Sequence, residues 1–172
     1  GYDFRPPYLQ IAEIRKFIPK VPVLALTATA TTEVITDIQK KLEFRAENAF
    51  RKSFERKNLT YVVIREEDKE GRMLRILKKV PGTGIIYVRN RKKTVETANF
   101  LRKNGIKADF YHAGLDNITR SKKQDAWIRE DIRIIVATNA FGMGIDKPNV
   151  RLVVHIDLPD NIEAYFQEAG RG

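Results

Sequence analysis

Ile134-Ile-Val-Ala-Thr-Asn-Ala-Phe-Gly-Met-Gly-Ile-Asp146 joins a short apolar run to a stretch of small and polar residues. A short apolar run that is rich in β-branched side chains is typical of a buried strand. Segments with helical periodicity separate most of the runs of this kind along the chain, and such alternation is typical of a parallel sheet covered by helices. The sequence therefore predicts an α/β fold with three layers, in which helices lie on both faces of a parallel sheet.

The alternation is regular from Leu59 onward and less complete before it. Strands are expected at residues 59–65, 84–88, 107–111, 133–137 and 151–156. Helices are expected at residues 68–79, 92–104, 117–129 and 161–170. The spacing of Asp160 and Glu163 predicts that Asp160 caps the last helix. The earlier part of the chain predicts a helix at residues 7–18, a strand at 21–26 and a helix at 32–42.

Two domains are expected, because residues 45–58 have no strong periodicity and suit a connector. Residues 1–54 form an α-β-α piece that is too small to be a domain, so we interpret it as the C-terminal part of one. Residues 55–172 hold a nearly complete α/β domain. The boundary is placed between these two ranges.

Composition narrows the class of protein. Apolar residues make up 42% of the chain, which suffices for a core, and no stretch approaches the roughly 18 apolar residues of a membrane span. A cytoplasmic protein is therefore expected. The absence of cysteine excludes disulfides and thiolate metal sites, and two histidines are too few for a zinc centre, so any metal must arrive with a substrate. The net charge of +10 suits a polyanionic partner such as nucleic acid, or only a solvated surface.

The loops that follow the strands carry the candidate binding residues, because ligands of open α/β sheets bind at the carboxyl ends of the strands. In the quoted stretch, the glycines allow close approach of a ligand, and Asp146 offers an acceptor for a ribose hydroxyl. Arg171 follows a helix that ends at Gly170, from where it could reach a transferring phosphoryl group. The alternatives are a tight turn capped by Asp146 and a basic helix end favoured by the helix dipole.

A second set of loop residues suits a phosphate grip. Asn90-Arg-Lys-Lys93 lies at a strand-to-helix turn, and Tyr111-His-Ala-Gly114 follows the next strand. Backbone amides at a helix start, with amide and basic side chains nearby, bind phosphate readily. His112 could as easily be a packing residue, and His155, which lies in an apolar strand, is interpreted as one.

Taken in order, these segments resemble motifs of the RecQ family of DNA helicases in superfamily 2. The resemblance covers essentially the whole chain, beginning with Gly1-Tyr-Asp-Phe-Arg-Pro6, which is similar to the end of the loop after that family's DEAH box. The matching motifs are Leu26-Thr-Ala-Thr-Ala-Thr31 (motif III), Gly84-Ile-Ile-Tyr-Val-Arg-Asn-Arg91 (motif IV), Tyr111-His-Ala-Gly-Leu115, Val136-Ala-Thr-Asn-Ala-Phe-Gly-Met-Gly-Ile-Asp-Lys-Pro148 (motif V) and Tyr165-Phe-Gln-Glu-Ala-Gly-Arg-Gly172 (the start of motif VI). The forms that motifs V and VI take in this chain resemble those of the RecQ family and of few other helicases.

The resemblance implies two RecA-like domains that close on ATP and Mg²⁺ and move along single-stranded DNA from 3′ to 5′, in DNA repair or recombination. Arg171 is the implied catalytic residue. The implied ATP-binding residues are Gly144, Asp146, Gln167, Gly170 and Arg171, the DNA-binding residues Asn90, Arg91, His112, Gly114 and Thr138, and the coupling residues Thr27 and Thr29.

The chain also departs from the family pattern. The phosphate loop, the adenine-reading glutamine motif and the DEAH box would precede Gly1, and the second arginine of motif VI would follow Gly172, as would zinc and winged-helix domains. This stretch is therefore not expected to hydrolyse ATP by itself. Two other interpretations stay open: a nucleic-acid-binding module without catalysis, and an RNA helicase of the same superfamily.

Overall fold

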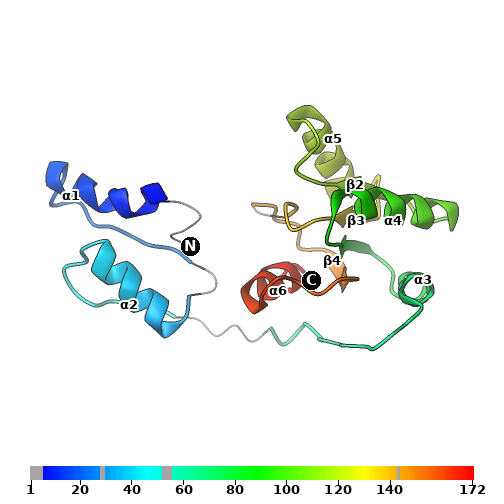
Figure 1. The fold of residues 1–172 in the computed structure, drawn as a ribbon, viewed down its shortest axis with the longest axis horizontal. Coiled ribbons are helices and arrows are strands. Elements are labelled where there is room, and N and C mark those ends of the chain that lie inside the picture. Colours follow the sequence, from blue (N-terminus) through cyan, green and yellow to red (C-terminus); the bar gives the residue numbers. More distant parts are fainter. Residues whose placement is uncertain (1–5, 28–29, 52–55, 143) are drawn as a thin grey trace. The chain divides into compact units, whose positions relative to one another are not determined.

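The computed structural model describes residues 6–27, 30–51, 56–142 and 144–172. The chain divides into two compact units, Gly1–Glu55 and Arg56–Gly172 (Figure 1). This division falls one residue beyond the boundary expected from the sequence. In the described residues, no helix is long and apolar enough to cross a membrane.

The second unit is built on a parallel sheet of four strands in the order β2-β3-β1-β4. Its strands are β1 (Thr83–Tyr87), β2 (Ala108–Tyr111), β3 (Ile134–Ala137) and β4 (Val150–His155). The register places Tyr87 of β1 between Ala137 of β3 and His155 of β4. All four carboxyl ends consequently meet at one edge of the sheet.

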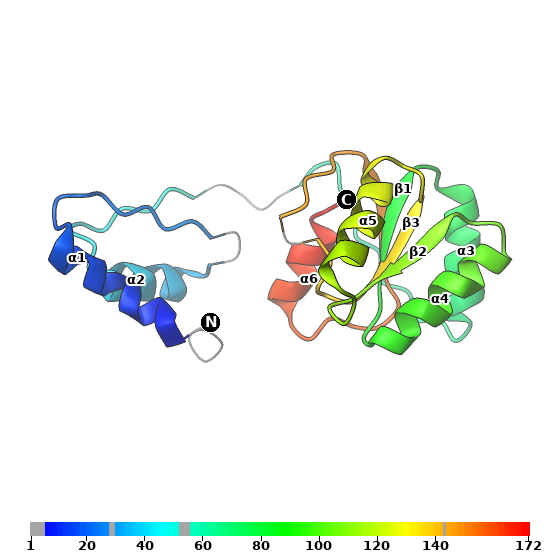
Figure 2. The same cartoon turned by 90° about the horizontal axis from the view of Figure 1, so that it is seen from above.

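Helices cover both faces of this sheet (Figure 2). The helices α3 (Lys69–Lys79) and α4 (Arg91–Lys103) lie on one face, and α5 (Asn117–Ile128) and α6 (Ile162–Ala169) lie on the other. Alternation along the strands divides the core, since Ile86 and Val136 face α3 and α4, whereas Ile85 and Ile135 face Trp127 of α5. The predicted three-layer α/β fold is confirmed.

Side-chain oxygens begin each of these helices. Asp68, Asn90 and Asp116 each accept a hydrogen bond from a backbone N–H in the first turn of the helix that follows. The last helix differs from the prediction, because its cap is Asn161, which accepts from the N–H of Ala164, and not Asp160. The helix begins at Ile162, one residue too late for Asp160 to be the cap.

The first unit contains helices but no strand in its described residues. A 3₁₀ helix, η1 (Pro6–Glu13), leads into α1 (Ile14–Phe17), and α2 (Thr32–Lys41) follows. The predicted strand at 21–26 is wrong. A strand exists only with a hydrogen-bonding neighbour, and Leu24 and Leu26 are instead 78% and 85% exposed.

The strand predicted at residues 59–65 is also wrong. Its composition suits a strand, but the segment forms no ladder with either edge strand of the sheet, β2 or β4. Val63 is 91% exposed. Apolar, β-branched residues therefore predict a tendency to pair, and the pairing itself depends on a partner strand.

Candidate nucleotide and nucleic-acid site

At the carboxyl edge of the sheet, the neighbouring strands β1 and β4 are followed by helices on opposite faces of the sheet. The chain after β1 enters α4 on one face, and the chain after the neighbouring β4 enters α6 on the other. Open α/β sheets bind ligands at such points. A small open pocket of about 70 Å³ lies there, lined by Tyr87, Val88, Arg89, Asn139, His155, Asp157, Leu158, Pro159, Asp160, Ala164 and Glu168.

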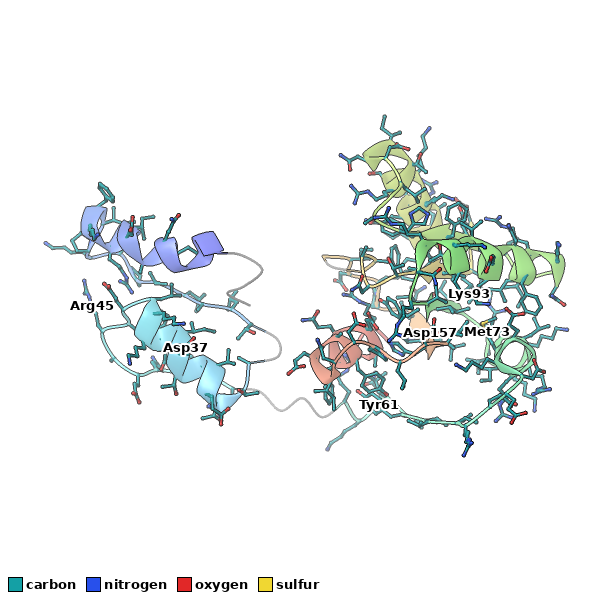
Figure 3. All side chains as sticks on the ribbon, in the orientation of Figure 1. Asp37, Arg45, Tyr61, Met73, Lys93 and Asp157 are labelled. Atoms are coloured by element: carbon teal, nitrogen blue, oxygen red, sulfur yellow. The ribbon has the colours of Figure 1, made fainter. Side chains whose placement is uncertain are left out.

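Asp157 joins the two loops that border this pocket. Its Oδ2 accepts a hydrogen bond of 3.0 Å from the backbone N–H of Arg89. Figure 3 shows Asp157, in the loop after β4, near Lys93, in the first turn of α4. Lys93 bonds Glu70 of α3 at 2.9 Å, and this hydrogen bond raises the pKa of the lysine above its ordinary value. The start of α4 is therefore tied to β4 and to α3.

Arg171 lies against the loop that follows β3. Its Nη1 donates to the carbonyl of Gly142, and its backbone N–H donates to Glu168 at 3.3 Å. Gly142 has a φ of +108°, and a Cβ at this position would clash with Nε of Arg171. The absence of a side chain at Gly142 is thus what makes room for the arginine.

One donor of Arg171 is unused. Its Nε is buried and has no hydrogen-bond partner in the part of the chain that the structure describes. Leaving a buried donor of a charged group unpaired costs free energy. An anion that reached this guanidinium would remove that cost.

Aromatic and polar contacts connect Arg171 to the centre of the sheet. The Tyr87 hydroxyl donates to the carbonyl of Phe141 at 3.2 Å, and burial raises the pKa of this phenol far above its ordinary value. The Tyr87 ring stacks on the His155 ring, with 5.3 Å between the ring centroids. Nε2 of His155 lies 2.8 Å from Oε2 of Glu168. Glu168 and the neighbouring Arg171 are therefore held to β1 and β4 through His155.

The sequence missed this His155–Glu168 pair. His155 was read as a packing residue in an apolar strand, and no spacing links it to a helix that begins several residues later. The pair becomes visible only when α6 packs on β4.

The other predicted ATP-binding residues are more dispersed. Gly170 ends α6 beside Arg171. Gly144 and Asp146 lie exposed on the loop after β3, and Gln167 lies exposed on α6. No hydrogen bond joins Asp146 or Gln167 to Arg171, all three of which the structure describes.

Three predicted DNA-binding residues lie together beyond the ends of β1 and β2. The guanidinium of Arg91 packs over Gly114, where a Cβ would come within 2.8 Å of Nη1. The His112 ring stacks on Phe110 at 5.7 Å, and its Nδ1 is buried without a partner among the described residues. Burial, and then the charge of Arg91, lower the pKa of His112. This cluster of Arg91, His112 and Gly114 is called the basic cluster below.

Asn90 and Thr138 make hydrogen bonds that hold the helix and the loop at this edge in place. Oδ1 of Asn90 accepts from the N–H of Lys93 at 2.8 Å and so caps α4. The N–H of Thr138 donates to Tyr111 at 3.4 Å, which links the loop after β3 to β2. The predicted coupling residue Thr27 is exposed in the first unit, and Thr29 lies outside the described residues.

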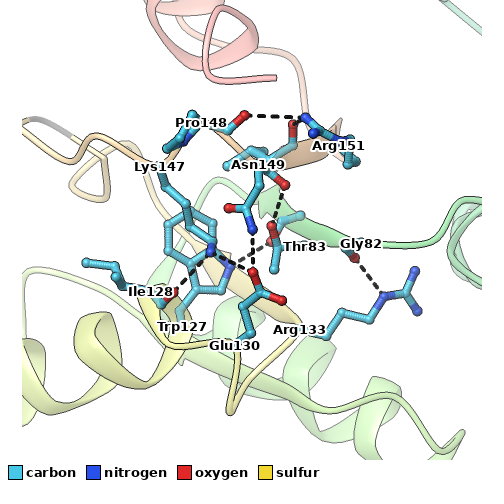
Figure 4. Close-up of polar contacts among 12 residues, drawn as sticks. Gly82, Thr83, Trp127, Ile128, Glu130, Arg133, Lys147, Pro148, Asn149 and Arg151 are labelled. Atoms are coloured by element: carbon cyan, nitrogen blue, oxygen red, sulfur yellow. Dashed lines mark hydrogen bonds and ion pairs between the residues drawn. The ribbon is translucent and has the colours of Figure 1, made fainter.

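The loop after β3 ends at the opposite edge of the sheet, where Lys147 is buried (Figure 4). The Lys147 side chain is 5% exposed, its Nζ donates to the Ile128 carbonyl at 3.1 Å, and it lies over the Trp127 ring at 5.4 Å. The Thr83 hydroxyl donates to the Asn149 carbonyl at 2.9 Å. The sequence did not single out this anchor, because an isolated lysine in a loop carries no signal of burial.

No cluster of three or more histidine, aspartate or glutamate side chains that could hold a metal occurs among residues 6–27, 30–51, 56–142 and 144–172. The carboxyl edge carries both signs of charge, because Asp157, Asp160 and Glu168 line the pocket together with Arg89. Among these and the nearby groups, the arginines are the ones that suit phosphate.

Relatives with curated names include RecQ DNA helicases and a putative ATP-dependent RNA helicase of Acanthamoeba polyphaga mimivirus, which is 42% identical over 174 residues, covering 99% of this chain and 32% of that protein. The chain is 41% identical over 172 residues to the ATP-dependent DNA helicase RecQ of Pasteurella multocida, covering 99% of this chain and 27% of that protein. It is 42% identical over 178 residues to the RecQ-like DNA helicase blm-1 of Caenorhabditis elegans, covering 99% of this chain and 18% of that protein. The chain thus spans less than a third of the length of these relatives, and the resemblance to RecQ helicases is confirmed.

Solved structures agree with the fold. A DEAD box protein from Methanococcus jannaschii matches 60% of this chain and 29% of its own, with a TM-score of 0.57 and 31% identity. Dbp5 of Saccharomyces cerevisiae, bound to RNA and ADP BeF3, matches 94% of this chain and 44% of its own, with a TM-score of 0.70 and 24% identity, a likeness of fold alone.

The family model described as the helicase conserved C-terminal domain matches residues 68–172. This range includes the whole sheet, the basic cluster and Arg171. The chain belongs to the family of helicase conserved C-terminal domains.

Proposed function

We propose that the chain is part of an ATP-dependent DNA helicase of the RecQ type, in which Arg171 contacts the phosphates of ATP and the basic cluster holds the DNA backbone. The observation that carries this proposal is the buried, unpartnered Nε of Arg171 at the end of a helix packed on the sheet. A guanidinium with a free donor in a partly dry site suits a phosphate oxygen.

The residues present fit a triphosphate. Arg171 would hold it, the glycine-bearing loop that contains Gly142 and Gly144 would approach it without side chains, and Asp146 would accept from the ribose. Mg²⁺ is proposed to arrive with the triphosphate. An arginine placed at a γ-phosphoryl group stabilises the charge that develops as the group transfers, an effect of about 10³ to 10⁵ in rate.

The DNA grip is proposed to work without reading sequence. Arg91 presents a guanidinium at the edge where the strands end, close enough to His112 for its charge to lower the pKa of that ring. A guanidinium neutralises phosphate charge, so binding should weaken steeply with salt. ATP binding would shift this grip relative to one on another domain, and hydrolysis would reset it. The proposed 3′ to 5′ direction and the role in repair or recombination rest on the RecQ resemblance.

The test is the DNA-stimulated ATPase of the full-length protein with Arg171→Ala. Turnover should fall by roughly 10³-fold or more while ATP affinity changes little. Arg129→Ala is the matched control, because Arg129 is an exposed arginine that ends α5 and whose side chain pairs, among the described residues, only with the exposed Asp131. Turnover equal to that of the control would overturn the proposal.

A non-catalytic nucleic-acid module predicts DNA binding without any effect of Arg171 on turnover, so a fall in turnover in the same experiment would exclude it. An RNA helicase is the second alternative, favoured by the 42% identity over 174 residues to the relative named a putative ATP-dependent RNA helicase. Unwinding of matched DNA and RNA duplexes by the full-length protein separates the two. RNA unwound at least as fast as DNA would assign the chain to RNA.

A further inference from the structure

The chain enters the second unit along α6. Arg56, Leu59 and Tyr61 follow one another on this entering segment, and each contacts the helix or its end. Cδ2 of Leu59 lies 3.1 Å from the position that a Cβ on Gly172 would occupy. The ring centroids of Tyr61 and Tyr165 are 6.1 Å apart. Figure 3 shows Tyr61 beside α6.

Arg56 makes the most specific of these contacts. Its Nη1 donates to the Gly170 carbonyl at 2.9 Å, and its Nη2 donates to the Gly172 carbonyl at 2.9 Å. These two carbonyls belong to the residues on either side of Arg171. Carbonyls at a helix end lack partners within the helix and carry partial negative charge, so a cation is well suited to them.

The geometry of the guanidinium makes this contact directional. Nε of Arg56 lies 3.4 Å from Oδ1 of Asn58, so all three kinds of guanidinium nitrogen have an acceptor. A planar group held at several nitrogens fixes the orientation of what it binds, which a lysine ammonium does not. The backbone on both sides of Arg171 is consequently set by one side chain.

Arg56 is also the first residue of the second unit, where the connector joins it. We propose that Arg56 is a positioning residue that fixes the backbone around Arg171. This inference rests on the function proposed above. A shift of about 1 Å at a group that contacts reacting atoms can cost roughly 10²-fold in rate.

The structure separates this role from a role in stability. Arg56 is exposed, so its contacts should contribute little to the free energy of unfolding. Arg65 is a matched control, since it is an exposed arginine on the same entering segment and makes no hydrogen bond or ion pair with any described residue.

The experiment measures DNA-stimulated ATP turnover of the full-length protein for Arg56→Ala, Arg56→Lys and Arg65→Ala. Arg56→Ala should lower kcat roughly 10- to 100-fold with KM for ATP changed less than about twofold. Arg56→Lys should restore little of this loss, and Arg65→Ala should match the parent. The thermal midpoint of all three should stay near that of the parent.

A double variant decides whether Arg56 acts through Arg171. Arg56→Ala combined with Arg171→Ala should turn over ATP no more slowly than Arg171→Ala alone, because both changes remove the same contribution to catalysis, that of the Arg171 side chain. Full turnover in Arg56→Ala, with Arg171→Ala inactive, overturns this inference and leaves the proposed function standing. Full turnover in Arg171→Ala overturns the proposed function itself. If the fold-losses in turnover of the two single variants multiply in the double variant, Arg56 acts independently of Arg171 and the inference is overturned.

Discussion

The two ends of the loop between β3 and β4 are held in different ways. The end near β4 is anchored in the fold, with Lys147 buried over Trp127 and Asn149 bonded to Thr83. The end near β3 carries Gly142 and Gly144, and its contact with motif VI is made by Arg171. One loop thus has a structural end and an end whose position depends on a proposed ATP-contacting arginine, so stability and activity should respond differently to changes in it.

Trp127→Ala should have the largest effect, because Trp127 contacts both ends of the loop. Its ring is almost fully buried, packs edge-on against Phe141 at 5.2 Å and lies under Lys147. We expect a loss of about 3–5 kcal/mol in the free energy of unfolding, measured by urea denaturation. Ile118→Ala, at a mainly exposed position of the same helix, is the control and should cost far less.

Lys147→Ala should affect mainly the anchored end. Removal of Nζ leaves the Ile128 carbonyl without this donor, and we expect a loss of about 1–3 kcal/mol in the same measurement. Lys122→Ala on the exposed surface of α5 should change stability by less than about 0.5 kcal/mol. Equal effects of the two lysine substitutions would show that the anchor does not exist in solution.

Gly142→Ala and Gly144→Ala sharpen the comparison at the other end. Both glycines have positive φ, so either alanine should cost about 1 kcal/mol of stability. Only the alanine at Gly142 would also displace Arg171, because the space around Gly144 is open. ATP turnover of the full-length protein should therefore fall further for Gly142→Ala. Turnover of Gly142→Ala equal to that of the parent would show that the Arg171 contact has no role in catalysis.

Asp146→Asn should have the smallest effect on stability. Asp146 is exposed, so its replacement should change the free energy of unfolding by less than about 0.5 kcal/mol. If it binds the ribose, KM for ATP in the full-length protein should nevertheless rise. An unchanged KM would remove Asp146 from the proposed site.

Local patterns predicted the second unit well. The strands and helices after residue 68 lie within one residue of their predicted bounds, because each strand is a short apolar run and each helix has a clear period and a capping residue at its start. The strands at 21–26 and 59–65 were wrong, since composition does not reveal whether a neighbouring strand is present.

The site was predictable only where its parts are sequence motifs. Arg171 and the glycines of the loop after β3 could be named, and the structure brings Arg171 to Gly142. The contacts of Arg56 with Gly170, of His155 with Glu168 and of Lys147 with Ile128 join residues that are distant in sequence. Such pairs depend on packing, which one sequence does not encode in any local pattern.

The place of β1 in the sheet has a consequence for how long the site keeps its form. All five residues of β1 are buried, and the strand is paired on both sides, with β3 and β4. Amide protons of such a strand exchange with solvent only when the unit as a whole opens. Arg89, Asn90 and Arg91 follow this strand closely. The strand that positions the basic cluster should therefore keep its structure for as long as the second unit stays folded, including when the loops around it move.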